Sequence, residues 1–288
     1  MKLHFTKMHG AGNDFIVIDC ISQDISSLTK DAWIFLANRQ LGIGADQILL
    51  VESPKSSGAD FRYRIINHDG SEVEQCGNGS RCFVRFVREK GLTSKKEIRV
   101  EVAHTTITLT EQEDMRVRVN MGPPIFEHDL IPFIPSHLDS QMIGPIKEFL
   151  LPLMQSNVWI TPLSMGNPHA VQIVDCVKTA LVSQIGPEME SHPSFPKRVN
   201  VGFVEVVDRS HINIRVFERG SGETLSCGTG ACAAAVTAIL KNLTDSPVTV
   251  QTRGGLLEID WQYAQHGLQA EVIMTGPATT VYEGVIEI

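Results

Sequence analysis

The chain has 288 residues, 42% of them hydrophobic and 20% charged, with a formal net charge of −8. This length allows one large domain or two of ordinary size, and the composition is that of a globular protein. The acidic balance argues against nucleic acid or an anionic membrane as the main partner, but it leaves open a small anion held in one local site.

The first residues, MKLHFTKMHGAGNDFIVID, do not read as a secretory signal, because charges and glycines interrupt every apolar run. No apolar stretch reaches the ~18–20 residues that a membrane span needs. We therefore expect a cytoplasmic protein without membrane association. The six cysteines are too few for a disulfide scaffold in a chain of this length, so free thiols are expected.

In the first half, a 3.6-residue period starting near Ser and Thr residues predicts a helix over 26–40, and the run that ends at Gly91 predicts another over 77–91. β-Branched or alternating segments predict strands over 15–20, 46–52, 61–67, 97–103, 106–110 and 116–122. The sheet content is therefore high, and the helices are few.

In the second half, residues 125–160 show little regularity, and we expect a surface excursion holding a short helix over 145–154. Another helix is expected over 178–186, and the Ala-rich run 228–242 is a strong helix candidate. Strands are predicted over 169–175, 201–208, 211–218, 248–255, 256–261 and 269–276.

Internal repetition is the most informative feature of the sequence. EVEQCGNGSRCF around Cys76 resembles ETLSCGTGACAA around Cys227, 151 positions later. At nearly the same offset, Asn13 aligns with Asn167 and RYRIINHDGSE aligns with NIRVFERGSGE. A repeat this long is typical of a duplicated domain rather than a solenoid. We predict one domain over 1–122, completed by 277–288, and a second over 123–276.

A cysteine just before a helix has a distinct chemistry. The unpaired N–H groups and the dipole of a helix N-terminus favour the thiolate, so we expect the pKa of Cys76 and of Cys227 to fall. The glycines allow a tight turn and a close ligand. Backbone N–H groups are then expected to face an anion; they belong to Gly77, Asn78, Gly79, Gly228, Thr229 and Gly230.

Other interpretations of these cysteines remain open. A single cysteine before a helix is more often a small buried hydrophobe than a catalyst. The C-x5-C and C-x4-C spacings are weak zinc signals, no C-x-x-C redox pair exists, and neither a P-loop nor a dinucleotide fingerprint is complete. We therefore expect no metal and no cofactor. The cysteines expected to be structural are Cys20, Cys82, Cys176 and Cys232.

Two matched thiols in two matched halves suit one reaction in particular. One thiolate removes a proton from a carbon, and the opposing thiol returns a proton to the other face, so the configuration inverts. The charge that develops on an adjacent carboxylate would be stabilised by helix N–H groups in the manner of an oxyanion hole, where a good donor contributes about 2.7–4 kcal/mol.

The sequence resembles the diaminopimelate epimerase family over essentially its whole length. The shared motifs are KMHGAGNDFIVID, GIGADQILLVE, NHDGSEVEQCGNGSRCF, SMGNPHAV, RVNVGFVEV and ERGSGETLSCGTGACAAA. The resemblance implies a cofactor-independent isomerase that converts LL-2,6-diaminopimelate to the meso form, on the route to lysine and peptidoglycan. It also implies an α+β fold with two pseudo-symmetric domains, each a barrel-like, mostly antiparallel sheet around a central helix. The substrate site would lie between the domains, and the family commonly forms homodimers.

The resemblance also assigns roles to individual residues. Cys76 and Cys227 would be the acid/base pair, and His169 and Glu218 would tune their proton affinity. The substrate-binding residues would be Asn13, Gln47, Asn67, Gly77, Asn78, Asn167, Asn200, Glu218, Arg219, Gly228 and Thr229. Arg219 can hold a carboxylate through two hydrogen bonds, and Glu218 with the asparagines can accept from an ammonium group.

Each assignment has a plainer alternative. Asn13 and Asn167 would also suit turns after glycine, Glu218 and Arg219 an exposed ion pair of little energetic value, and His169 an ordinary strand histidine. Two other functions also stay open: a proline-racemase-like enzyme acting on another amino acid, and a thiol redox or metal-binding protein.

Overall fold

The structure is a computed structural model that describes residues 1–73, 77–103 and 105–288. The chain folds into two compact units, which are described separately. Unit 1 contains Met1–Asn120 and Thr275–Ile288, and unit 2 contains Met121–Met274. The boundaries predicted from the sequence were 122/123 and 276/277. In the described ranges, no helix is long and apolar enough to cross a membrane.

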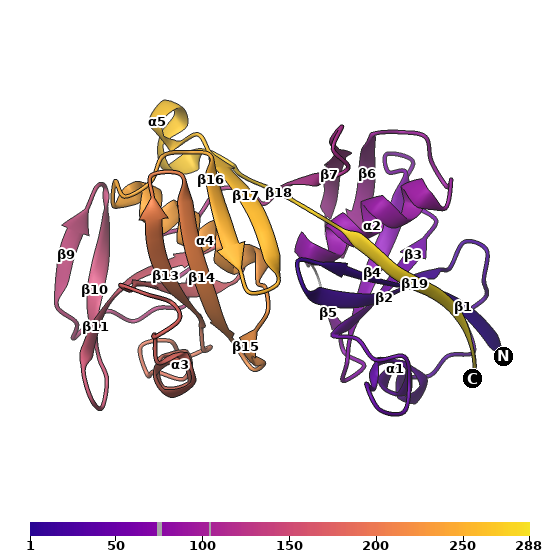
Figure 1. The fold of residues 1–288 in the computed structure, drawn as a ribbon, viewed down its shortest axis with the longest axis horizontal. Helices are drawn as coiled ribbons and strands as arrows, with labels where there is room; N and C mark the ends of the chain where they lie inside the picture. Colours follow the sequence, from indigo (N-terminus) through magenta and orange to yellow (C-terminus); the bar gives the residue numbers. More distant parts are fainter. Residues whose placement is uncertain (74–76, 104) are drawn as a thin grey trace. The chain divides into compact units, whose positions relative to one another are not determined.

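Unit 1 is a curved sheet around one helix, α2 (Figure 1). Its elements are β1 (Lys2–Gly10), β2 (Asn13–Asp19), α1 (Lys30–Ala37), β3 (Gln47–Glu52), β4 (Phe61–Asn67), β5 (Glu72–Val73), α2 (Gly77–Glu89), β6 (Glu97–Val102), β7 (Thr105–Glu111), β8 (Val117–Asn120) and β19 (Thr279–Glu287). Strands β2 and β3 are parallel, as are β4 and β6, and the other pairs are antiparallel. The C-terminal strand β19 returns to pair with β1.

Unit 2 repeats this plan with different helices and strands. Its elements are β9 (Ser140–Ile143), β10 (Ile146–Pro152), β11 (Asn157–Ser164), β12 (Pro168–Ile173), α3 (Val182–Glu190), β13 (Asn200–Asp208), β14 (His211–Glu218), β15 (Gly222–Thr224), α4 (Gly228–Leu240), β16 (Val248–Thr252), β17 (Gly255–Trp261), α5 (Tyr263–His266) and β18 (Val272–Gly276), whose end passes into unit 1. Here β12 and β13 are parallel, as are β14 and β16. The order of parallel and antiparallel pairs therefore matches that of unit 1, which confirms the predicted duplicated α+β fold.

Each unit buries one helix against its own strands. Helix α4 packs on β11, β12, β13, β14, β16 and β17, and α2 packs on β1, β2, β3, β7 and β8. The run of alanines in α4 is fully buried, because a side chain of one methyl group lets the sheet approach the helix closely. Both helices begin directly after the cysteine motifs, at Gly77 and Gly228.

Two sequence predictions for residues 125–160 were wrong. The predicted helix 145–154 is the strand β10, which pairs with β9 on one side and β11 on the other. The segment is also no surface excursion, because Ile131, Phe133, Phe149 and Leu151 lie in the hydrophobic core of unit 2. Long-range strand pairing and burial decided this region, and neither is visible in the local pattern.

The other predicted helices form with adjusted ends. Helix α1 is shorter than 26–40 and starts after Thr29, whose side chain accepts a hydrogen bond from the Ala32 amide. Helix α3 starts four residues later than predicted and runs through Pro187 to Glu190. No candidate site residue lies in the segments where the predicted and observed helix ends differ.

Candidate active site

Cys227 occupies the N-cap position of α4 and is 6% exposed. Its Sγ lies 3.5 Å from the hydroxyl oxygen of Thr229. A Cβ added to Gly230 would lie 3.2 Å from the Cβ of Cys227 and 3.3 Å from its Sγ. A glycine at this position therefore leaves the space that the thiol occupies.

The environment of Cys227 holds its proton tightly. Burial raises the pKa of the Cys227 thiol well above its ordinary value, and the charge of Glu218 raises the pKa further. Hydrogen bonds from Thr229 and from the Gly230 amide lower the pKa but do not compensate. The expectation of a lowered pKa was thus wrong for Cys227, because a helix N-terminus is outweighed here by desolvation and a nearby carboxylate. At neutral pH the residue is a thiol and can act as a proton donor.

Cys76, the other predicted acid/base residue, lies outside the described residues, in the gap between 73 and 77. The helix that follows it is described from its first residue. Gly77 and Asn78 begin α2, and both are buried. Their amides belong to the first turn, whose N–H groups have no partner within the helix. These groups are suited to bind an anion.

In unit 2, the ends of three strands bring the predicted polar residues together. Parallel pairing places His169 on β12 opposite Asn200 on β13. The Asn200 side chain accepts a hydrogen bond from the Arg219 amide at 3.0 Å and donates to the Pro168 carbonyl at 3.0 Å. Asn200 thereby fixes the end of β14, where Glu218 and Arg219 lie.

His169 is a buried neutral side chain. Burial, together with the positive charge of Arg219, lowers its pKa to about 3. Its Nε2 lies 2.9 Å from the side-chain oxygen of Asn167. An amide oxygen only accepts, so the imidazole donates from Nε2 and Nδ1 carries the lone pair. The histidine thus orients the Asn167 carboxamide, beyond its place in the strand.

Glu218 has a partner that the sequence analysis missed. The hydroxyl group of Thr224 on β15 donates a hydrogen bond to the Glu218 carboxylate. This hydrogen bond holds the carboxylate whose charge also raises the pKa of Cys227. The signal was the hairpin ERGSGET itself, since its two strands place positions 218 and 222 opposite each other.

In unit 1, the predicted residues form two hydrogen-bonded pairs. Gln47 lies opposite Asn67 in the antiparallel β3–β4 pair, and its Nε2 donates to the Asn67 side-chain oxygen at 3.0 Å. Asn78 donates to the Asn13 side-chain oxygen at 3.2 Å. The Oε1 atom of Gln47 is buried and has no hydrogen-bond partner in the part of the chain that the structure describes. It is available to accept from a bound ammonium group.

Two glutamates of the repeated motifs, and two of the cysteines predicted to be structural, make bracing or packing contacts. Glu72 and Glu223 each accept two hydrogen bonds from an arginine on the neighbouring strand, Arg64 and Arg215 respectively. Cys82 and Cys232 are fully buried within α2 and α4. These contacts agree with bracing and packing roles.

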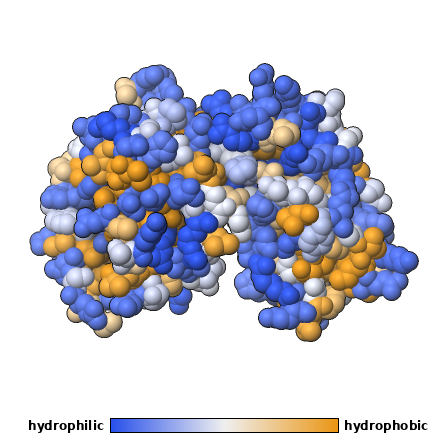
Figure 2. All heavy atoms as spheres, in the orientation of Figure 1, coloured by the Kyte–Doolittle hydropathy of each residue, from blue (hydrophilic) through white to orange (hydrophobic). Residues whose placement is uncertain are grey.

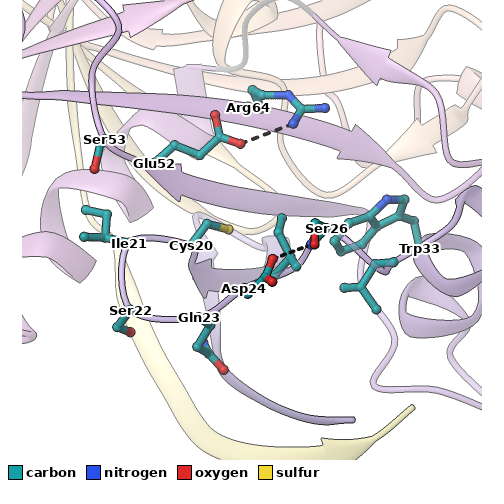
Figure 3. A pocket seen from close by; sticks show the side chains of 12 residues that line it. Cys20, Ile21, Ser22, Gln23, Asp24, Ser26, Trp33, Glu52, Ser53 and Arg64 are labelled. Atoms are coloured by element: carbon teal, nitrogen blue, oxygen red, sulfur yellow. Dashed lines mark hydrogen bonds and ion pairs between the residues drawn. The ribbon is translucent and has the colours of Figure 1, made fainter.

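Cys20 lies in a separate cavity of unit 1. The cavity has a volume of about 810 Å³, and Trp33, Glu52 and Arg64 are among the residues that line it (Figure 3). Burial, followed by the charges of Glu52 and Asp19, raises the pKa of Cys20 to about 12. Its thiol is therefore un-ionised at neutral pH and is a poor nucleophile.

The sequence matches the family described as "Diaminopimelate epimerase" over residues 5–127 and 161–281. This chain belongs to the diaminopimelate epimerase family. A diaminopimelate epimerase from Ralstonia nicotianae is 54% identical over 288 residues, which cover 100% of this chain and 97% of that protein. One from Cupriavidus pinatubonensis is 56% identical, with 100% and 98% covered.

Solved structures of more distant proteins share the fold. A phenazine biosynthesis protein of the PhzF family from Bacillus anthracis has a TM-score of 0.69 at 17% identity and covers both chains fully. A hydroxyproline epimerase from Agrobacterium vitis has a TM-score of 0.68 at 15% identity, covering 99% of this chain and 92% of that one. At these identities, the likeness establishes the duplicated architecture alone.

Proposed function

We propose that this protein is an isomerase that converts LL-2,6-diaminopimelate to meso-diaminopimelate without a cofactor, in the synthesis of lysine and peptidoglycan precursors. The observation that carries the proposal is the family match over both halves, together with relatives at 54–56% identity that are named diaminopimelate epimerases. The state of Cys227 agrees with it, because a buried, protonated thiol at a helix N-terminus is suited to deliver a proton.

In the proposed mechanism, the thiolate of Cys76 removes the α-proton of the L-configured centre, and the C–H electron pair passes into the adjacent carboxylate. The thiol of Cys227 then gives its proton to the opposite face of the planar carbon. The configuration inverts, Cys76 ends as the thiol, and Cys227 ends as the thiolate. The reverse reaction uses the same residues with exchanged roles, as microscopic reversibility requires.

The charge on the reacting carboxylate is stabilised by backbone amides. We assign this role to Gly77, Asn78, Gly228 and Thr229, which lie in the first turns of α2 and α4. The distal carboxylate and ammonium groups of the substrate are assigned to a larger polar set: Asn13, Gln47, Asn67, Asn167, Asn200, Glu218 and Arg219. The buried, unpartnered Oε1 of Gln47 supports an ammonium ligand, since an ammonium group only donates.

The assay that tests the function offers two substrates. Purified protein is incubated with LL-diaminopimelate or with L-proline, and the stereochemistry of the product is followed with a coupled, meso-specific dehydrogenase and by chiral chromatography. We expect turnover of LL-diaminopimelate and incorporation of one solvent deuteron at the reacting carbon in D2O. Turnover of proline alone would replace the proposal with a proline-racemase-like function, and an unlabelled product would exclude the thiols as solvent-exchangeable donors.

We further propose that the protein is a cytoplasmic homodimer. Several apolar side chains of the C-terminal segment are exposed, including Val281 (54%), Tyr282 (46%) and Val285 (53%). Apolar side chains also gather over β1 and β19 on the visible face of unit 1 (Figure 2). Such a patch is typical of an interface. Sedimentation equilibrium should give twice the chain mass, and the mass of a single chain at micromolar concentration would contradict the dimer.

A further inference from the structure

Arg81 is a fully buried guanidinium in the α2 helix, and the sequence analysis gave it no role. Its Nη2 donates to the side-chain oxygen of Asn78 at 2.9 Å, and its Nε donates to the Pro277 carbonyl at 3.1 Å. A Cβ on Gly10 would lie 3.0 Å from Nη2 and 3.1 Å from the Asn78 carbonyl oxygen. A glycine at position 10 therefore leaves room for this arginine to reach Asn78.

From Asn78, a chain of side-chain hydrogen bonds leads to the surface. Asn78 Nδ2 donates to the oxygen of Asn13 at 3.2 Å, and Asn13 Nδ2 donates to Asp46 Oδ2 at 2.9 Å. Asp46 is held in turn, because its other carboxylate oxygen accepts from Arg39 at 2.8 Å and its amide donates to Asp14 at 2.9 Å. The chain thus begins at a guanidinium and ends at a carboxylate.

The two ends fix the direction of the chain. A carboxamide can present either its oxygen or its nitrogen to a neighbour by rotating through 180°, so neither asparagine determines its own orientation. Arg81 only donates, which turns the oxygen of Asn78 toward it. Asp46 only accepts, which turns the nitrogen of Asn13 toward it.

We propose that Arg81 and Asp46 are positioning residues that set the orientation of the Asn78 and Asn13 carboxamides in the binding site. The effect on substrate rests on the proposed function, in which Asn13 contacts the substrate through its side chain and Asn78 through its backbone amide. Reversing either amide would place its oxygen against a carboxylate or its nitrogen against a guanidinium, which loses one hydrogen bond to a charged group. A ligand therefore meets the same donors and acceptors in every molecule.

Unit 2 orients the equivalent asparagine without a charged residue. The position of α4 that corresponds to Arg81 is Cys232, since the helices begin at Gly77 and Gly228. There, the asparagine equivalent to Asn13 is Asn167, and its oxygen faces the Nε2 of His169, which is neutral above about pH 3. The orienting role of Arg81 is thus specific to unit 1.

The kinetic test uses three variants and two matched controls. Asp46→Asn can donate as well as accept, Arg81→Met cannot donate, and Arg81→Lys still can. We expect the KM for LL-diaminopimelate to rise about 10-fold or more in Asp46→Asn and in Arg81→Met, with kcat within about threefold of wild type, because ground-state orientation is lost. Arg81→Lys should recover most of the loss. The controls Asp60→Asn and Arg88→Met alter groups that pair with Lys95 and Glu111 instead, and their KM should not change.

A second measurement reports orientation without any substrate. In protein labelled with 15N-asparagine, the side-chain NH2 signals of Asn13 and Asn78 should shift in Asp46→Asn and Arg81→Met and stay in place in the two controls. If wild type does not epimerise diaminopimelate but these signals move, the proposed function fails and the positioning role stands. If wild type is active but KM and signals match the controls, the positioning role is overturned. Equal KM losses in Arg81→Lys and Arg81→Met would also overturn it, since a donor would then not matter.

Discussion

The two units share a fold but differ in the polar side chains at equivalent strand positions. Phe15 pairs with Gln47 in unit 1 at the register where His169 pairs with Asn200 in unit 2. The residue at the end of the next strand is Asn67 in one unit and Glu218 in the other. The strand pairing is therefore shared by the two units, whereas the polar side chains at these equivalent positions differ.

In the proposed mechanism, this difference suits Cys227 to the role of proton donor. Glu218 raises the pKa of the Cys227 thiol, whereas a neutral asparagine at the equivalent place has no charge with which to do so. Unit 2 is thus specialised to keep a proton on its sulfur. In the proposed mechanism, this proton is the one delivered to the substrate carbon.

The largest effect is expected from removing either sulfur. Cys76→Ala and Cys227→Ala should each lower the rate of epimerisation by about 10²–10⁴-fold, which is the usual contribution of a positioned acid or base. In D2O, each variant should still exchange the proton at the face that its remaining cysteine serves.

Cys20→Ala is the matched control, since Cys20 lies in a separate cavity of unit 1, and it should keep wild-type turnover. Coupled assays and mass spectrometry of the recovered substrate give both quantities. Near-wild-type epimerisation by Cys227→Ala would end the two-base scheme.

The next effect tests the charge difference between the units. In Glu218→Gln, burial still raises the pKa of Cys227 but the carboxylate no longer does, so the thiol should ionise at lower pH. Alkylation of Cys227 by iodoacetamide between pH 7 and 10, followed by peptide mass spectrometry, should therefore be faster than in wild type. kcat/KM should fall about 10–150-fold, because a hydrogen bond to a charged group is also lost.

Glu205→Gln provides the control, since that carboxylate accepts from the Val177 amide instead. Its alkylation rate should equal that of wild type. The complementary change, Asn67→Asp, places a carboxylate at the equivalent position of unit 1. An unchanged alkylation rate in Glu218→Gln would show that burial alone protects the proton.

Much of this fold could be predicted because the internal repeat can be seen in the sequence. The paired motifs at Cys76 and Cys227 located α2 and α4 to within two residues of their ends, and alternation located most strands. The helix prediction for residues 146–152 was wrong because Lys147, Glu148 and Leu150 favour a helix when only the local sequence is considered. In the structure, Glu148 is buried and forms an ion pair with Lys241, the residue that follows α4, and no local pattern predicts this contact.

The site was predictable in its residue types but not in its electrostatics. The motifs pointed to Asn200 and Glu218, whose proximity follows from strand register. The raised pKa of Cys227 depends on its depth and on the position of one carboxylate, which requires coordinates. The burial of Arg81 was not predicted, because a charged residue in a helix is usually exposed. Its neighbours Cys82, Phe83 and Val84 are all buried, and this apolar run was a signal of burial.

A third prediction exchanges a residue between the units. The folded protein binds a proton at His169 only below about pH 3, because burial and then Arg219 lower its pKa, whereas an unfolded histidine binds one below about pH 6.5. The stability present above about pH 6.5 is therefore lost progressively as the pH falls toward about 3, by up to about 1.4 kcal/mol per pH unit.

His169→Phe installs the residue that unit 1 carries at Phe15 and should flatten this dependence. Urea unfolding between pH 4 and 8 measures the slopes, and the exposed His137→Ala should retain the wild-type slope. Parallel curves for wild type and His169→Phe would mean that other groups set the acid sensitivity.

The smallest effect compares two equivalent ion pairs. Arg64 and Arg215 each make a two-bond contact with a glutamate on the adjacent strand, at 2.7–2.9 Å. The Glu72 side chain is 45% exposed and Glu223 is 18% exposed. Arg64 also pairs with Glu52, but that carboxylate keeps Arg62 as a second partner. Arg215 also donates to the Val177 and Ala180 carbonyls, so its removal takes a donor from two backbone acceptors.

Arg64→Met should therefore lower the free energy of unfolding by about 0.5–1 kcal/mol, and Arg215→Met by about 1–3 kcal/mol. Urea titrations at low and high salt measure both, and the Arg64 effect should shrink more with salt because that pair is more exposed. Equal losses in the two variants would mean that the added carbonyl contacts contribute nothing and that the duplicated pair has kept its original strength in both units.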